Sequence, residues 1–140
     1  MRKATIERNT KETQIKLSFN LDGSGDSQIQ TGIGFFDHML DLFTVHGLFD
    51  LTIQVNGDLH VDAHHSVEDV GICLGKAIKD ALGEFRGIQR YASGAFPMDD
   101  SLCSIALDIS GRAFLSIDEL PAQALGEFHS ELVEEFFRAV

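Results

Sequence analysis

The residues from Asp62 to Asp69, in the order Asp-Ala-His-His-Ser-Val-Glu-Asp, are the part of the chain best suited to metal chemistry. The adjacent imidazoles of His64 and His65, followed by the carboxylate of Glu68, combine the nitrogen and oxygen donors that borderline divalent metals favour. If this stretch opens a helix, His64 and Glu68 lie one turn apart on the same face. His65 then points about 100° away. One helix start could therefore offer donors to two different ions.

The same eight residues also have a purely structural interpretation. His-His pairs occur in ordinary loops, and the run from Ser66 to Asp69 has the form of a capping box at a helix start. The pattern is less specific than paired Cys-x-x-Cys motifs or the His-Glu-x-x-His motif of zinc proteases. On these residues alone, both interpretations stay open.

The composition is that of one globular domain. A chain of 140 residues with 44% hydrophobic content can bury a sizeable core. The net charge of −11 argues against nucleic acid or an anionic membrane as a partner, and solubility is its simpler explanation. No apolar run is long enough to cross a bilayer, and the amino terminus lacks the pattern of a signal peptide. With only two cysteines, Cys73 and Cys103, both expected to be small buried residues, we expect a cytoplasmic protein.

Hydrophobic periodicity predicts alternating strands and helices in the first half of the chain. The predicted order is three strands, a helix, a strand and a helix. Gly47 and Gly83 stand where helix terminators are preferred. The clearest strand patterns cover residues 14–21, 28–31 and 51–55, and the helical patterns cover residues 35–43 and 67–81.

The second half begins the same order again. Strand patterns cover residues 88–96, 103–109 and 113–117, with a turn at 97–100, and an amphipathic helix pattern runs from Phe128 to Val140. We interpret this as an internal repeat with units 1–86 and 87–140, the second truncated after its first helix. The chain would then lack its last third. The alternative is a domain that simply ends in a helix.

Several segments, taken together and in order, resemble the imidazoleglycerol-phosphate dehydratase family, enzymes of histidine biosynthesis. The resemblance runs from Glu7 to Val140 and implies an α+β fold built as a duplicated half-domain. Each half is then a four-stranded sheet with two helices on one face, the halves pack helix to helix, and the second copy is incomplete. The segments that carry the resemblance are Arg8–Thr13, Thr31–Leu40, His46–Asp50, Asp62–Asp69 and Asp108–Arg112.

The resemblance also implies two manganese ions per active site, bound between the subunits of a homo-oligomer. In the family, each half supplies a His from its first helix and a His-His-x-x-Glu motif from its second. Asp37 could orient the ring of His38, which without the resemblance is a residue on the flank of an apolar helix. Glu135 stands where some members have the second-half His, and no second His-His-x-x-Glu motif occurs in the sequence. By motif, the candidate ligands are His38, His64, His65, Glu68 and, less directly, Glu135.

The family's reaction removes water from imidazole glycerol phosphate to give imidazole acetol phosphate. Because the departing proton sits on a carbon without a neighbouring carbonyl, two metals on the imidazole nitrogens would serve as the electron sink. Glu12 is the family-matched acid or base and substrate contact, and His46 is a further substrate contact. Arg90 and Arg112 match the phosphate-binding arginines, whose planar guanidinium groups suit phosphate oxygens. Without the resemblance, Glu12, Arg90 and Arg112 would be interpreted as ordinary solvated charges. His46 would then be a charge that is favourable at the carboxyl end of a helix.

The absence of the second motif limits what the resemblance predicts for this chain. We expect the 140-residue chain to bind manganese weakly and to turn over little or no substrate, since each ion would lose about half of its protein ligands. Two other functions stay open: an inactive or partly active fragment that acts as an assembly module, and another dimetal enzyme that acts on phosphate esters through a metal-bound hydroxide.

Overall fold

The computed structural model describes all residues from 1 to 140. Its first unit contains β1 (Lys3–Asn9), β2 (Thr13–Asn20), β3 (Ser27–Gln30), α1 (Gly34–Gly47), β4 (Asp50–Gly57) and α2 (His64–Leu82). Its second part contains β5 (Tyr91–Met98), β6 (Ser101–Asp108), β7 (Ala124–Leu125), β8 (Phe128–His129) and α3 (Glu131–Ala139). None of these helices combines the length and hydropathy needed to cross a lipid bilayer.

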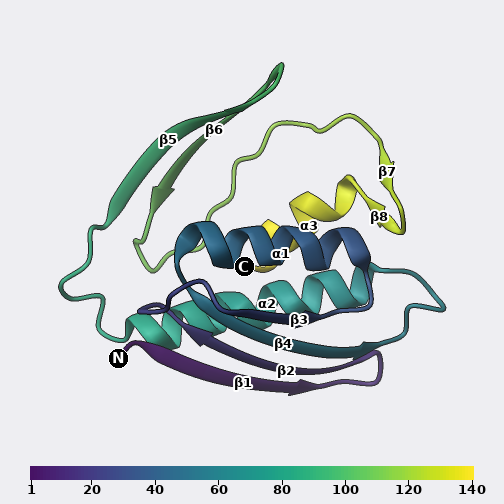
Figure 1. Cartoon of the computed structure of the whole chain (residues 1–140), viewed down its shortest axis with the longest axis horizontal. Helices are drawn as coiled ribbons and strands as arrows, with labels where there is room; N and C mark the ends of the chain where they lie inside the picture. Colours follow the sequence, from purple (N-terminus) through teal and green to yellow (C-terminus); the bar gives the residue numbers. More distant parts are fainter.

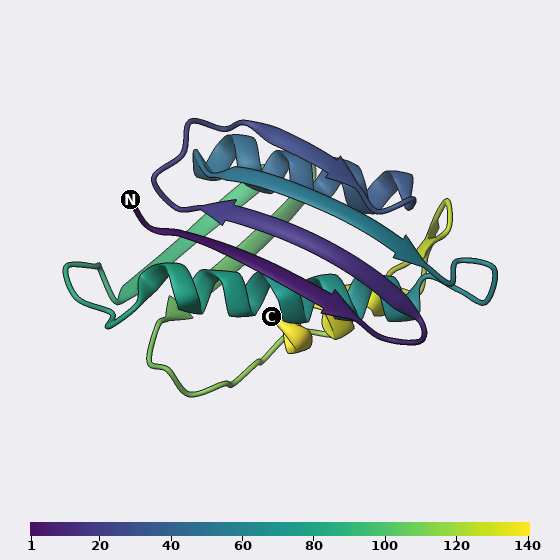
Figure 2. The ribbon, with the colours of Figure 1, turned by 90° about the horizontal axis from the view of Figure 1, so that it is seen from below.

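The first unit is a four-stranded sheet with α1 and α2 on one face (Figure 1). The strand order is β1-β2-β4-β3, in which β3 runs parallel to β4 and the other neighbours are antiparallel. Figure 2 shows the sheet from its open side, with both helices behind it. The alternating residues Ile15, Leu17 and Phe19 of β2 are at most 3% exposed because they point into the layer between sheet and helices. The predicted α+β half-domain is therefore confirmed.

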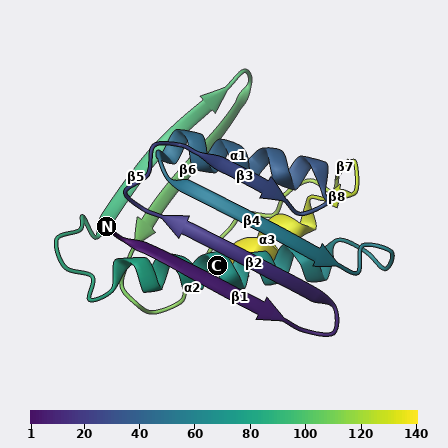
Figure 3. The same cartoon turned by 60° about the horizontal axis from the view of Figure 1, so that its bottom comes forward.

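The second part has no such layered sheet. The β5–β6 hairpin extends away from the body of the molecule (Figure 3), and nearly all of its residues are exposed. In contrast, α3 packs closely against α2, where Gly71 and Gly75 let the two helices approach each other. A Cβ atom at Gly71 would lie 2.8 Å from the Cβ of Ala139, and one at Gly75 would lie 2.3 Å from the carbonyl oxygen of Val140. The two parts of the chain thus meet helix to helix, as predicted.

The predicted strand at residues 113–117 is wrong, because residues 109–123 form no helix or strand. These residues join none of the three sheets, so no neighbouring strand satisfies their backbone hydrogen-bonding groups.

Other boundaries also differ from the sequence predictions. The final helix begins at Glu131 and not at Phe128, which instead lies in β8 and packs its ring against Phe36 at a centroid distance of 5.9 Å. Strand β5 begins at Tyr91 and not at residue 88, and it includes two residues of the predicted turn. Cys103 is exposed, in contrast to the prediction, because no helix covers β6.

Gly47 does not provide the left-handed residue expected at the end of a helix. It is the last residue of α1, and the residue after it, Leu48, takes the left-handed conformation with φ 55°. Gly47 is needed for another reason. A Cβ atom there would lie 2.3 Å from the ring of Phe49, so only glycine lets this ring fold back against the helix end.

Candidate functional site

The first turn of α2 carries the predicted pair of donors. The Nε2 atom of His64 lies 3.7 Å from a carboxylate oxygen of Glu68, and both side chains are 43% exposed. A small rotation of either exposed side chain would bring both donors within bonding distance of one shared ion. The helix begins at His64, whose N–H donates to the carboxylate of Asp62 at 2.8 Å. Ser66 is inside the helix and makes no cap, so the capping-box interpretation is wrong.

His65 is held in a different direction from His64. The two rings are 5.9 Å apart and nearly perpendicular, at 84°. The Nδ1 atom of His65 lies 2.9 Å from an oxygen of Asp58. Because an ionised carboxylate only accepts hydrogen bonds, Nδ1 carries the proton in the neutral ring and Nε2 keeps its lone pair. The hydrogen bond to Asp58 raises the pKa of His65, and the charge of Glu12 acts in the same direction.

The turn that carries Glu12 is anchored beside the start of α2. The carbonyl oxygen of Glu12 accepts a hydrogen bond from the N–H of Asp58 at 3.0 Å. On the other side of the turn, Asp69 is only 6% exposed. It accepts a hydrogen bond from the hydroxyl of Thr13 and forms an ion pair with Arg8 at 2.9 Å. This pairing raises the pKa of Arg8. The main chain that carries the exposed carboxylate of Glu12 is therefore held in place by these contacts.

His38 is exposed in the second turn of α1. The proposal that Asp37 orients its ring is wrong, because the Asp37 carboxylate instead accepts hydrogen bonds from the N–H and hydroxyl of Thr31 at 2.9 and 2.5 Å. The amino ends of α1 and α2 point to the same end of the molecule (Figure 1). Because His38 is near the start of α1 and His64 is the first residue of α2, both residues are at that end. Glu135 is half-buried on α3. Within the chain, no three of these donor types converge on one point.

The predicted phosphate-binding arginines lie near the open end of the β5–β6 hairpin. Arg90 forms two hydrogen bonds with Asp108, at 2.7 and 3.2 Å, and its guanidinium group lies 4.9 Å from the ring centre of Tyr91. Arg90 lowers the pKa of Asp108 by this pairing, and the charge of Arg112 acts in the same direction. The structure thus pairs Arg90 with Asp108, and Arg112 acts on the same carboxylate only through its charge.

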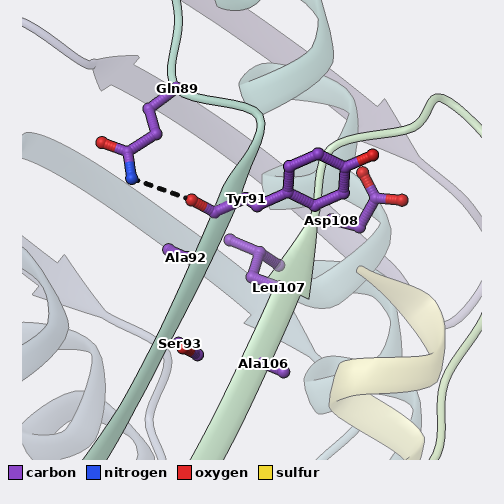
Figure 4. A pocket seen from close by; sticks show the side chains of 7 residues that line it. All are labelled: Gln89, Tyr91, Ala92, Ser93, Ala106, Leu107 and Asp108. Carbon is purple, nitrogen blue, oxygen red and sulfur yellow. Dashed lines mark hydrogen bonds between the residues drawn. The ribbon is translucent and has the colours of Figure 1, made fainter.

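A shallow pocket lies on the hairpin, lined by the two sequence neighbours of Arg90 and by its partner Asp108 (Figure 4). The ring of Tyr91 and the carboxylate of Asp108 lie at its end, and the Gln89 amide donates to the Tyr91 carbonyl at 3.0 Å. The residues that line the pocket are Gln89, Tyr91, Ala92, Ser93, Ala106, Leu107 and Asp108.

The two groups of candidate residues lie at opposite ends of α2. This helix has 19 residues and therefore spans about 28 Å. His64 is its first residue, whereas Arg90 follows its last residue by a short loop (Figure 1). His46 is in the last turn of α1, at the end away from His38. Within one chain, the candidate metal and acid–base residues are therefore far from the candidate phosphate-binding residues.

Comparison with known proteins decides the family. The sequence model described as imidazoleglycerol-phosphate dehydratase matches residues 31–140. A protein of that name from Acetivibrio thermocellus is 61% identical over 140 residues, which are 99% of this chain and 72% of the relative. The chain belongs to the imidazoleglycerol-phosphate dehydratase family. The resemblance found in the sequence motifs is thereby confirmed.

Other members of the imidazoleglycerol-phosphate dehydratase family support the same assignment. The Geobacter sulfurreducens protein is 57% identical, over 99% of this chain and 72% of the relative. The crystal structure of the Staphylococcus aureus enzyme matches with a TM-score of 0.81 and 38% identity, over 98% of this chain and 75% of that chain. The fold of this chain is therefore that of the family.

Sequence reasoning missed the residues that hold the candidate donors of this family member in place. Asp58 lies shortly after the strand pattern at residues 51–55, and the sequence assigned no role to it. Its contact with His65 depends on how β4 and α2 pack, and no spacing rule predicts it. Arg8, Thr13 and Asp69 could each have been suspected, since all three lie in segments that resemble the family, but their contact with one another could not.

Proposed function

We propose that this chain acts in the manganese-dependent dehydration of imidazole glycerol phosphate to imidazole acetol phosphate, a step of histidine biosynthesis, in the cytoplasm. The observation that carries the proposal is the set of donors at the start of α2. There, the exposed pair of His64 and Glu68 lies beside His65, whose ring is oriented by Asp58. Family membership supports the choice of substrate, because the named relatives are imidazoleglycerol-phosphate dehydratases.

The donor types fit manganese. Imidazole nitrogen and carboxylate oxygen are both suitable ligands for this ion. His64 and Glu68 are exposed and close enough to share one ion, while His65 offers Nε2 in another direction. His38 and Glu135 are the further donors we propose. When bound, the metal would supply the Lewis acidity that draws electrons from the substrate's imidazole ring.

Glu12 is the proposed acid–base residue. Dehydration requires the removal of a proton from carbon and the loss of a neighbouring hydroxyl as water. The exposed carboxylate of Glu12 can accept that proton, and its main chain is fixed by the hydrogen bond from Asp58. A fixed base is effective because less ordering is needed when the substrate binds.

Arg90, Arg112 and His46 are the proposed contacts for the rest of the substrate. Arg112 makes no ion pair in the chain, whereas the donors of Arg90 already bind Asp108. A phosphate group would therefore compete with Asp108 for Arg90 and meet Arg112 without competition. Because these residues lie a helix length from Glu12, we propose that they serve the site of a neighbouring copy in a homo-oligomer.

The experiment measures manganese binding and the reaction product separately. Electron paramagnetic resonance titration gives the manganese affinity of the wild type and of His64→Ala and Glu68→Ala. His60→Ala is the matched control, since His60 is an exposed histidine with no proposed role. Mass spectrometry then distinguishes imidazole acetol phosphate from released phosphate after incubation with imidazole glycerol phosphate.

We expect both ligand variants to lose at least about 10-fold in manganese affinity and the control to lose none. We expect imidazole acetol phosphate as the product, at a rate far below that of a full-length relative measured alongside, because the chain supplies a single His-His-x-x-Glu motif. Unchanged affinity in His64→Ala and Glu68→Ala would contradict the proposed metal site. Release of phosphate without imidazole acetol phosphate would contradict the proposed reaction.

A further inference from the structure

Asp58 contacts two parts of the candidate site at once. Its carboxylate accepts a hydrogen bond from Nδ1 of His65 at 2.9 Å, and its main-chain N–H donates to the carbonyl oxygen of Glu12 at 3.0 Å. The Asp58 side chain is only 16% exposed, whereas that of His65 is 40% exposed. The carboxylate thus lies beneath the ring, on the protein side.

The position of Asp58 is set by the sheet. Strands β2 and β4 are antiparallel, and their ladder ends with Thr13 opposite Gly57. Asp58 and Glu12 are the next residues outward, and the hydrogen bond between them extends the ladder by one step. The Asp58 carbonyl also accepts the N–H of Val61 at 2.7 Å, which closes the turn that leads to α2. The main chain of Asp58 is therefore fixed at both its N–H and its carbonyl.

The packing of β4 on α2 brings the Asp58 carboxylate to His65. A Cβ atom at Gly57 would lie 2.1 Å from the hydroxyl of Ser66, so the strand end and the first helical turn are in direct contact. The Oδ1 atom of Asp58 is buried without a hydrogen-bond partner, which leaves His65 as the only hydrogen-bond partner of this carboxylate. A largely buried carboxylate with one partner interacts more strongly with it than an exposed one does, because less solvent competes.

We infer that Asp58 is a positioning residue that fixes the orientation and tautomer of His65, so that Nε2 is the nitrogen available to a metal ion. This inference rests on the proposed function for its purpose. The orientation itself is a property of the chain and can be measured without metal. A carboxylate that receives the second ring N–H of a metal-binding histidine restricts the ring and makes it a stronger donor.

The first test is nuclear magnetic resonance of the metal-free protein, in which long-range nitrogen–proton correlations identify the protonated ring nitrogen. At alkaline pH, where the ring is neutral, we expect His65 of the wild type to carry its proton on Nδ1. Asp58→Ala removes the acceptor and should shift the proton to Nε2, the usual site in free histidine. Asp58→Asn keeps an acceptor oxygen and should retain the proton on Nδ1. Asp62→Asn removes a nearby charge that does not touch the ring and should also leave it there.

The second test is manganese affinity in the same variants. We expect a loss of about 10- to 100-fold for Asp58→Ala and a smaller loss for Asp58→Asn. A role in folding alone would change thermal stability without this order of affinities and without a change of tautomer. The protection of the residue 58 amide from hydrogen exchange should persist in Asp58→Ala, because its bond to Glu12 uses main-chain atoms only.

The outcomes separate this inference from the proposed function. A wild-type His65 protonated on Nε2 would overturn the inference, and this measurement needs no variant to fold. A changed tautomer with unchanged manganese affinity would overturn the positioning role for metal binding. If the wild type binds no manganese while Asp58→Ala still shifts the tautomer, the proposed metal function fails and the structural part of the inference stands.

Discussion

The first unit and the β5–β6 hairpin show the same hydrophobic alternation, but the apolar residues are buried in the first unit and exposed in the hairpin. In β2, Leu17 is 0% exposed, whereas Leu107 in β6 is 55% exposed. Both strands are paired along their length, so hydrogen bonding does not explain the difference. The helices α1 and α2 cover the first sheet, and no helix covers the hairpin (Figure 1). Alternation therefore predicts a paired strand, but a covering layer decides whether its apolar face is buried.

The same contrast applies to two ion pairs of similar length. Arg8 and Asp69 are 2.9 Å apart, and Arg90 and Asp108 are 2.7 Å apart. The Asp69 side chain is 9% exposed, whereas that of Asp108 is 43% exposed. Water and salt screen the second pair, while the loss of one partner from the first leaves a buried group unpaired. Burial, and not distance, should therefore decide what each pair contributes.

The largest contrast should come from truncating one leucine in each region. Leu17→Ala leaves a cavity between sheet and helices and should lower the free energy of unfolding by about 3 kcal/mol. Leu107→Ala on the exposed hairpin should change it by less than about 0.5 kcal/mol. Urea denaturation followed by circular dichroism measures both. A similar loss for Leu107→Ala would show that the hairpin is covered in solution, for example by a second copy.

A smaller contrast should come from neutralising one acid in each ion pair. Asp69→Asn weakens the contacts to Arg8 and Thr13 and should cost about 1–2 kcal/mol, after allowance for the partial exposure of Arg8. Asp108→Asn should leave the free energy of unfolding unchanged, because the Arg90 pair is exposed. The same denaturation experiment at two salt concentrations compares them. Equal effects would mean that burial of Asp69 does not strengthen its pairing.

Replacing one glycine by alanine in each region should also change the free energy of unfolding by different amounts. Gly57→Ala collides with the hydroxyl of Ser66 and should cost about 1–2 kcal/mol by forcing α2 from β4. At Gly94 in β5, the atoms nearest to the new methyl belong to the ring of Phe96, which is exposed and free to turn, so Gly94→Ala should be tolerated.

The double variant tests the cause of the Gly57 effect. The Ser66 hydroxyl is buried without a partner, so Ser66→Ala alone should be neutral or slightly stabilising. Combined with Gly57→Ala, it removes the colliding atom and should restore most of the lost stability. Thermal melting of the two single variants and the double variant gives the coupling energy. Additive effects would place the cause elsewhere than in this contact.

The smallest effect should be a pH dependence at the exposed edge of the first sheet. The hydrogen bonds from Arg2 hold the pKa of Asp22 at about 2, below the ordinary aspartate value of 3.8. Because the folded-state pKa is lowered, the interaction stabilises the fold above the unfolded pKa and is lost as the pH falls toward the folded pKa. We expect a slight loss of stability across this interval in the wild type and a shallower one in Asp22→Asn. Parallel profiles would show that the pair does not contribute.

Local periodicity in the sequence was sufficient for the first unit. Strands and helices there were predicted because each places its apolar residues on one face at a fixed period, and that face is buried. The position of His64 and Glu68 on one side of α2 follows from the same period. The family motifs added the proposed roles of these residues.

The contacts between elements could be found only in the folded chain. The Asp58–His65 hydrogen bond depends on the register of β2 with β4 and on the packing of β4 against α2, which are long-range interactions. The irregular segment at 113–117 and the exposure of the hairpin depend on partners that no local pattern reports. Local periods encode which residues can share a face, whereas burial and side-chain pairing require two distant segments to meet. For this reason, the sequence determined the elements and the candidate donors, and the tertiary structure determined which donors are held in place.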